Sequence, residues 1–202
     1  MSNIFDDIRL YLPKYLSDND LTRLLSELRQ YSNNLDKRIY TSALKDEPVL
    51  FQGDGFSNVL MPDIANRKFH TGKVILISNS CDSSLENSRI YSSYVTFTPL
   101  FSLKKYEAGL LNKFDPKKVT SHIRSIREQG VSSFFYLPPS ETGEEYFSRF
   151  DLCFSMPLTK LLHDNLLKNK LFTLSDYGFY LLLIKLSIHF SRAQEKVHRN
   201  PY

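Results

Sequence analysis

The sequence predicts an α+β fold, in which a small antiparallel β-barrel carries one helix before it and two to three helices after it. The apolar run at residues 74–77 leads into a polar loop that contains Cys81 and Asp82. Polar loops at strand ends commonly carry functional sites. A Gly-Asp-Gly turn at residues 53–55 precedes this run, and a second apolar run follows at residues 94–98. Short strands separated by turns are typical of a small barrel.

Residues 1–47 are expected to form a helical extension ahead of the barrel. Ser17 and Asp20 have the spacing of a capping box, in which both side chains bond the first free N–H groups of a helix. Leucines follow at helical spacing at positions 21, 24, 25 and 28. This pattern predicts an amphipathic helix, and the polar residues 31–47 are expected to connect it to the barrel.

Residues 48–156 are expected to form the barrel core. Residues 53–55 are interpreted as a hairpin turn, because their spacing matches no phosphate-binding or dinucleotide-binding loop. Residues 61–71, which include Pro62, are expected to form a loop. The strands expected in this core are residues 48–51, 56–60, 74–77, 94–98, 132–137 and 149–155.

A helix is expected within the core at residues 116–129. Asp115 stands where an N-cap would lie, Pro116 suits the first helical turn, and Gly130 provides a stop. The apolar side chains of Val119, Ile123 and Ile126 are expected to face inward.

Residues 157–202 are expected to form the C-terminal helices. Pro157 opens one helix, and Ser175 caps a longer one at residues 176–198. The longer helix has an apolar stripe that is expected to be buried, formed by Phe179, Leu182, Leu183, Leu186, Phe190, Ala193 and Val197. A second stripe is basic and is predicted to bind nucleic acid on an exposed edge, formed by Lys185, His189, Arg192, Lys196 and Arg199. Two alternatives stay open: the basic stripe is a solvated face, and His189 is a packing residue.

Composition excludes several classes of protein. The chain has 202 residues and a net charge of +4, which fits one domain with helical flanks. Its two cysteines, Cys81 and Cys153, exclude a disulfide framework, and no cysteine or histidine spacing predicts a metal site. The charged N-terminal residues exclude a signal peptide, and no apolar run is long enough to span a membrane. We therefore expect a cytoplasmic protein with no metal, no cofactor and no membrane contact.

Positive charge is concentrated in the second half of the chain. Residues 100–130 carry seven Lys or Arg against three acids, and residues 160–202 again carry seven against three. Two basic helical segments suit a polyanionic partner when they share a face.

The order of these elements resembles the PemK/MazF-like family of toxins, which are SH3-like barrels. The matching pieces are the Gly-Asp at residues 53–54 and the strands at residues 72–78 and 93–99. Members of the family cleave RNA without a metal, using an arginine before the central strand and a hydroxyl on the later strand. Here Gly72 or Lys73 takes the place of the arginine, and Ser92, Ser93 or Thr96 supplies the hydroxyl.

Two functional hypotheses follow. In the first, the protein is a metal-independent endoribonuclease of a toxin-antitoxin or phage-defence system, with Lys73, Asp82 and Ser93 as catalytic residues. Asp82 has the alternative role of capping a turn, which Asp often does. In the second, the protein is a non-catalytic module that binds nucleic acid or a protein. An antitoxin, another partner protein and a homodimer through the first helix or the barrel edge are further expected partners.

Overall fold

The computed structural model describes residues 37–44, 47–84, 90–91, 93–140, 143–163 and 166–191, together with Asn19 and Ser26. The predicted first helix lies outside these residues, apart from Asn19 and Ser26, which are helical. The strands are β1 (Tyr40–Thr41), β2 (Gly55–Asp63), β3 (Lys68–Leu76), β4 (Tyr94–Ser102), β5 (Phe134–Leu137), β6 (Tyr146–Arg149), β7 (Phe154–Pro157) and β8 (Lys170–Leu174). The helices are α3 (Leu103–Leu111), α4 (Pro116–Arg127), α5 (Leu158–His163) and α6 (Asp176–Ser191), with 3-10 turns η1 (Lys37–Ile39), η2 (Phe150–Leu152) and η3 (Leu166–Asn169).

The α+β class is confirmed, but the predicted closed barrel is wrong. Eight strands form one antiparallel sheet in the order β1-β8-β2-β3-β4-β6-β5, and β7 pairs with β4. Strand β4 changes partner along its length, because residues 94–97 pair with β7 and residues 100–102 pair with β6. Pro99, which has no N–H to donate, lies between the two sets of pairs. The sheet branches at this point, and within the described residues it does not close.

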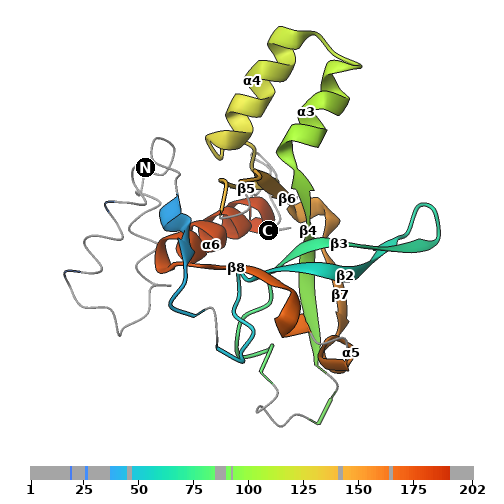
Figure 1. Ribbon diagram of the computed structural model, residues 1–202, viewed down its shortest axis with the longest axis vertical. Helices are drawn as coiled ribbons and strands as arrows, with labels where there is room; N and C mark the ends of the chain where they lie inside the picture. The colour runs from blue at the N-terminus through green and yellow to red at the C-terminus, as the bar shows by residue number, and fades with distance from the viewer. Residues whose placement is uncertain are drawn as a thin grey trace, which may run out of the picture.

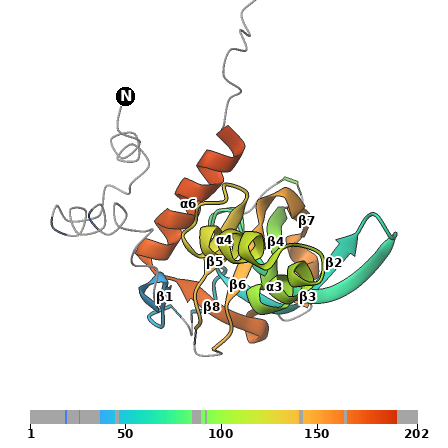
Figure 2. The ribbon, with the colours of Figure 1, turned by 90° about the horizontal axis from the view of Figure 1, so that it is seen from above.

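The predicted hairpin at residues 48–60 is also wrong, because residues 48–51 are not a strand. The N–H of Phe51 donates to the Asp54 carboxylate at 3.0 Å, and the N–H of Asp54 donates to the carbonyl of Phe51 at 3.0 Å. These local bonds use backbone groups that a strand ladder would need. The hairpin instead joins β2 to β3 and includes much of the predicted loop at residues 61–71. Figures 1 and 2 both show this hairpin extending away from the body of the protein.

The described residues bury three hydrophobic clusters. The first lies between α6 and the sheet and includes Ile75, Phe135 and Leu181. The second packs β2, β3 and β4 against α5 and η3. The third packs α3 and α4 against β5 and β6. Because their apolar sides are held in the third cluster, α3 and α4 stand together as a helical hairpin that projects from one end of the sheet (Figure 1).

Helix α6 buries its predicted apolar stripe only in part. Leu182 is fully buried and Phe179, Leu183 and Leu186 pack against the first cluster, while Ala193 and Val197 lie outside the described residues. Phe190 of the predicted apolar stripe is 65% exposed, whereas Tyr177, Leu181 and Lys185 are buried. The helix is apolar on most sides, so periodicity alone does not select the buried face. Gly178 indicates which face of α6 packs against η1, since a Cβ atom at this position would lie 2.2 Å from the carbonyl oxygen of Ile39. The missing side chain therefore allows α6 to approach the backbone of η1 closely.

Candidate nucleic-acid interface

Two of the three predicted catalytic residues, Lys73 and Ser93, lie apart. Lys73 belongs to β3, where the next residue, Val74, pairs with Pro99 of β4. Ser93 directly precedes β4 and is six residues from Pro99, which corresponds to about 20 Å of strand. Asp82 lies in the loop that follows β3, beyond the end of the strand opposite to the hairpin tip. The structure therefore does not bring Lys73 and Ser93 together in one site.

Asp82 stabilises a turn, as the alternative interpretation expected. Its backbone N–H donates to the side-chain oxygen of Asn79 at 2.7 Å. Its carboxylate accepts a hydrogen bond from the side-chain amide of Asn79 at 2.6 Å. These reciprocal bonds close the loop after β3 and give Asp82 a structural role.

The expected exposed edge of α6 is wrong at Lys185. This side chain is only 3% exposed, and its Nζ donates to the carbonyl oxygens of Gln129 at 2.8 Å and Val131 at 2.6 Å. Both carbonyls follow the C-terminal end of α4, where helix dipoles favour a cation. Burial lowers the pKa of Lys185 to about 8. Through these two hydrogen bonds, Lys185 joins α6 to the segment that follows α4.

Of the rest of the predicted basic stripe, only His189 lies within the described residues. The ring of His189 is half-buried and lies 5.7 Å from the ring of Phe150. It is therefore a packing residue, as the alternative interpretation expected. Arg192, Lys196 and Arg199 lie outside the described residues.

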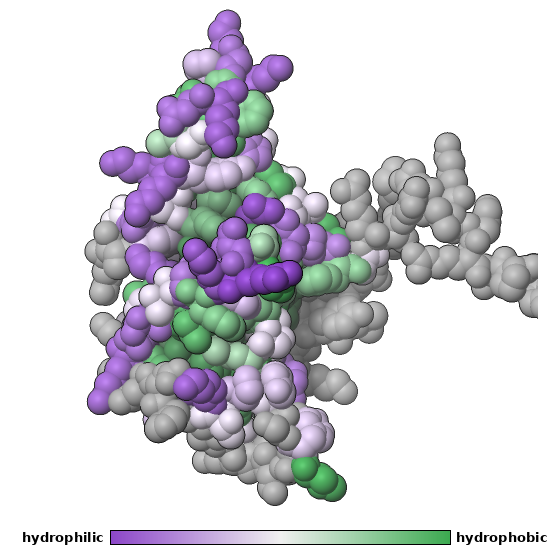
Figure 3. Space-filling model, turned by 90° about the vertical axis from the view of Figure 1, so that its right-hand side faces the viewer, coloured by the Kyte–Doolittle hydropathy of each residue, from purple (hydrophilic) through white to green (hydrophobic). Residues whose placement is uncertain are grey.

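The exposed positive charge gathers instead on the α3–α4 hairpin. Ser102 caps α3, and Asp115 caps α4 by accepting hydrogen bonds from the N–H groups of Lys117 at 3.0 Å and Lys118 at 3.2 Å. Among the described residues, five exposed lysines of this hairpin have no ion-pair partner: Lys104, Lys105, Lys113, Lys117 and Lys118. Figure 3 shows hydrophilic side chains covering the hairpin at the top of that view.

The two arginines of α4 have structural partners. Arg124 pairs with Glu128 one helical turn later, at 2.8 Å. Arg127 binds Glu145 through two hydrogen bonds of 2.8 and 2.7 Å, and the hydroxyl of Tyr136 donates to the same carboxylate at 2.5 Å. This second group fixes the base of α4 to the sheet. The lysines rather than the arginines are therefore available to a ligand.

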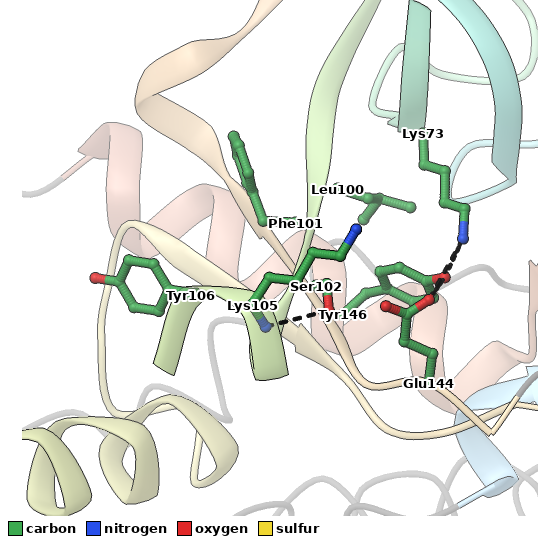
Figure 4. Close-up of a pocket in the computed structure, with 8 residues that line it drawn as sticks. All are labelled: Lys73, Leu100, Phe101, Ser102, Lys105, Tyr106, Glu144 and Tyr146. Carbon is green, nitrogen blue, oxygen red and sulfur yellow. Dashed lines mark hydrogen bonds and ion pairs between the residues drawn. The ribbon is translucent and has the colours of Figure 1, made fainter. Parts of the chain in front are cut away.

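A pocket of about 420 Å³ opens at the base of α3. Figure 4 shows that β3, the end of β4, the first turn of α3 and the start of β6 contribute its walls. The side chains of Lys73 and Lys105 reach it from different elements (Figure 4). Its lining residues are Lys73, Leu100, Phe101, Ser102, Lys105, Tyr106, Glu144 and Tyr146.

Lys73 is held in this pocket by a hydrogen-bonded network. Its ammonium donates to the hydroxyl of Tyr146, lies 3.6 Å from the Glu144 carboxylate and stands 4.5 Å from the centre of the Tyr146 ring. The hydroxyl of Tyr146 in turn donates to Glu144. The pocket thus combines a cation, a phenol and a carboxylate.

The network fixes the charge state of each member. Burial lowers the pKa of Lys73, but its hydrogen bond to Tyr146 and the charge of Glu144 outweigh this effect and leave the pKa raised. Burial raises the pKa of Tyr146, and the hydrogen bond from Tyr146 lowers the pKa of Glu144. At neutral pH the pocket therefore holds an ammonium, a neutral phenol and a carboxylate.

Sequence reasoning identified Lys73 but missed its companions. Glu144 lies between the strands expected at residues 132–137 and 149–155, and Tyr146 begins β6, a strand that was expected three residues later. Lys105 lies in the basic segment 100–130, whose charge was visible in the sequence. That charge was the available signal, but the prediction placed the nucleic-acid surface on the basic stripe of α6 instead.

No known protein family matches the chain, and no curated protein matches it. None of the described helices combines the length and apolar character needed to cross a membrane. Within the described residues, no group of three His, Cys, Asp or Glu side chains is placed to hold a metal ion.

Proposed function

We propose that this protein binds nucleic acid through the α3–α4 hairpin and the pocket at its base. The observation that carries the proposal is the group of five exposed lysines of the hairpin without an ion-pair partner in the described chain. Lysines in such a group bind phosphates without further chemistry, and the release of counterions from the nucleic acid favours the complex.

The pocket supports nucleic acid over a purely acidic partner such as an acidic protein segment. Lys73 and Lys105 line the pocket together with the aromatic residues Phe101, Tyr106 and Tyr146, and Lys73 stands against the Tyr146 ring. A basic groove combined with aromatic side chains suits single-stranded nucleic acid, because lysines bind the backbone while rings stack on bases. An acidic peptide would use the lysines and leave the aromatic surface unused.

The test compares two double charge reversals by fluorescence anisotropy with a labelled single-stranded RNA. Lys117→Glu with Lys118→Glu removes two lysines from the hairpin, whereas Lys160→Glu with Lys168→Glu makes the same change in net charge on exposed positions of α5 and η3. The hairpin variant should bind more weakly, with the slope of log K against log salt reduced by about 0.7 per lost phosphate contact. Equal weakening by both variants would show that only net charge matters and would contradict the proposed surface.

A second candidate function is metal-independent RNA cleavage in the pocket, favoured by the Lys73, Tyr146 and Glu144 network. In this reaction Glu144 accepts the proton of a ribose 2′-hydroxyl, and the 2′-oxygen forms a bond to phosphorus. The bond from phosphorus to the 5′-oxygen breaks, and Tyr146 donates a proton to that oxygen. Lys73 neutralises charge that develops on the phosphate. The resemblance to PemK/MazF-like toxins gives a further reason to test cleavage.

The cleavage test uses end-labelled RNA in the presence of EDTA. The expected products carry a 2′,3′-cyclic phosphate and a 5′-hydroxyl, and Lys73→Met and Glu144→Gln should each slow their formation by at least about 100-fold. If the wild-type protein binds the RNA but leaves it intact, the cleavage hypothesis is contradicted and the binding function is retained.

A further inference from the structure

In the outer half of the β2–β3 hairpin, the two strands pair only with each other among the described strands. Strand β8 pairs with β2 only at Gly55 and Phe56, and β4 pairs with β3 only over residues 74–76. Beyond these pairs, residues 59–63 and 68–72 are paired only with each other among the described strands. Five residues of strand extend about 17 Å. We call this ribbon the arm, and it points away from the body in both ribbon views (Figures 1 and 2).

One face of the arm is packed and the other is open. Val59 and Met61 point to the second hydrophobic cluster and are only 3% and 7% exposed. The opposite face carries Leu60 and Phe69, which are 39% and 70% exposed. Exposed apolar side chains grouped on one face often mark a contact surface, so this open face is a candidate.

The open face leads into the pocket. Side chains alternate along a strand, so Phe69 and Lys73 of β3 lie on the same face, four residues and about 13 Å apart. This distance corresponds to roughly four nucleotides of a stacked single strand at ~3.4 Å each. The arm therefore extends the pocket by a length that a short oligonucleotide can cover.

The charge of the arm fits the same ligand. Arg67 of the turn and Lys68 directly precede Phe69 and are exposed, although the alternation of side chains along β3 directs Lys68 to the face opposite to Phe69. The carboxylate of Asp63 is occupied within the turn, where it accepts hydrogen bonds from the N–H of Asn66 at 3.1 Å and its side-chain amide at 2.8 Å. A positively charged surface with an exposed aromatic ring binds single-stranded nucleic acid by pairing with phosphates and stacking on bases.

We propose that Phe69 stacks on a base of single-stranded nucleic acid whose chain runs along the open face of the arm into the Lys73 pocket. This inference rests on the proposed function and names its substrate class. Bases in a duplex are stacked on each other and present only their edges in the grooves, so a duplex offers no base face to Phe69.

The first experiment uses tryptophan fluorescence, because the chain contains no tryptophan. Phe69→Trp places a single reporter on the arm. Phe190→Trp is the matched control, since Phe190 is 65% exposed and lies on α6, on the other side of the molecule from the arm (Figure 2). Titration with a single-stranded 12-nucleotide RNA or DNA should quench the Phe69→Trp variant strongly and the Phe190→Trp variant weakly. The matching duplex should quench neither strongly.

The second experiment measures affinity by anisotropy for Phe69→Ala and Phe190→Ala. Loss of one stacked base should weaken single-strand binding by Phe69→Ala by about tenfold and leave Phe190→Ala unchanged. Binding by the wild-type protein without quenching and without an effect of Phe69→Ala would overturn this inference and leave the proposed function intact. Strong quenching by the duplex would overturn the single-strand assignment. Absence of any binding by the wild-type protein would overturn both.

Discussion

The lysines near the C-terminus and the lysines of the α3–α4 hairpin are the same chemical group in opposite settings. Lys185 of α6 is buried and donates to two backbone carbonyls, and Lys170 of β8 is buried beside the carboxylate of Asp54. Lys117 and Lys118 of α4 are exposed and have no ion-pair partner in the described chain. The first pair holds the fold together, and the second pair is available to a ligand.

This difference shows that the charge of a segment does not identify its role. Residues 100–130 and 160–202 have the same balance of bases and acids. What separates them is the surroundings of each ammonium, since a buried cation needs compensating groups and an exposed one is satisfied by water. Substitutions at both kinds of lysine, or at their partners, can therefore test the comparison.

The largest effect is expected when the buried ion pair is broken. Lys170 Nζ lies 3.0 Å from Asp54, and the two side chains are 7% and 0% exposed. Asp54→Asn keeps the shape of the side chain but leaves the Lys170 ammonium without a counter-charge, which should lower the free energy of unfolding by about 3–5 kcal/mol. Urea denaturation measures this loss. The control is Asp151→Asn at the more exposed pair with Arg149, where about 1 kcal/mol or less is expected; equal losses would contradict the distinction.

A smaller loss is expected for Lys185→Met. Methionine fills most of the space of the lysine stem but leaves the carbonyls of Gln129 and Val131 without their donor, which should cost about 1–3 kcal/mol. Lys118→Met is the matched substitution on the exposed side of α4 and should change stability by less than about 0.5 kcal/mol. A stable Lys185→Met protein would mean that water replaces the ammonium at the end of α4.

The smallest effect concerns pH. Burial lowers the pKa of Lys185 from its ordinary value of 10.5 to about 8, so between these values the unfolded chain binds more protons than the folded chain. The contribution of Lys185 to stability therefore rises with pH in this window, by about 1–2 kcal/mol between pH 8 and 9.5. Burial raises the pKa of Cys153 to about 11, which acts in the opposite direction.

The measurement must therefore compare the wild-type protein with Lys185→Met at each pH. The difference between their unfolding free energies isolates Lys185, because the cysteines and tyrosines are common to both. If the difference in unfolding free energy between the two proteins stays constant from pH 8 to 9.5, the lowered pKa of Lys185 in the folded protein is contradicted.

Local signals in the sequence predicted local structure well. The helix at α4 was predicted with its Asp115 cap and its buried Val119, Ile123 and Ile126, all of which are confirmed. Ser175 also accepts the predicted type of N-terminal hydrogen bond, from the N–H of Gly178 at 3.2 Å. Strands at residues 74–76 and 94–98 are confirmed as parts of β3 and β4.

Features that depend on distant residues were not predictable in the same way. The short strand β8 begins at a lysine whose ion-pair partner, Asp54, precedes it by more than a hundred residues. The face of α6 depends on the contact of Gly178 with η1. The pocket combines Lys73 of β3 with residues of α3 and β6. These residues are far apart in the sequence, so no spacing between them predicts that they line one pocket.

The third hydrophobic cluster makes the basic hairpin a modular part of the molecule. Its buried residues all come from one continuous stretch between Leu103 and Phe147, and none belongs to β1, β2, β3, β8 or α6. Sequence changes on the outer surface of this stretch can therefore accumulate in evolution without disturbing the packing of the other two clusters. The charge on the outer surface of the hairpin can therefore change while the rest of the sheet keeps its packing.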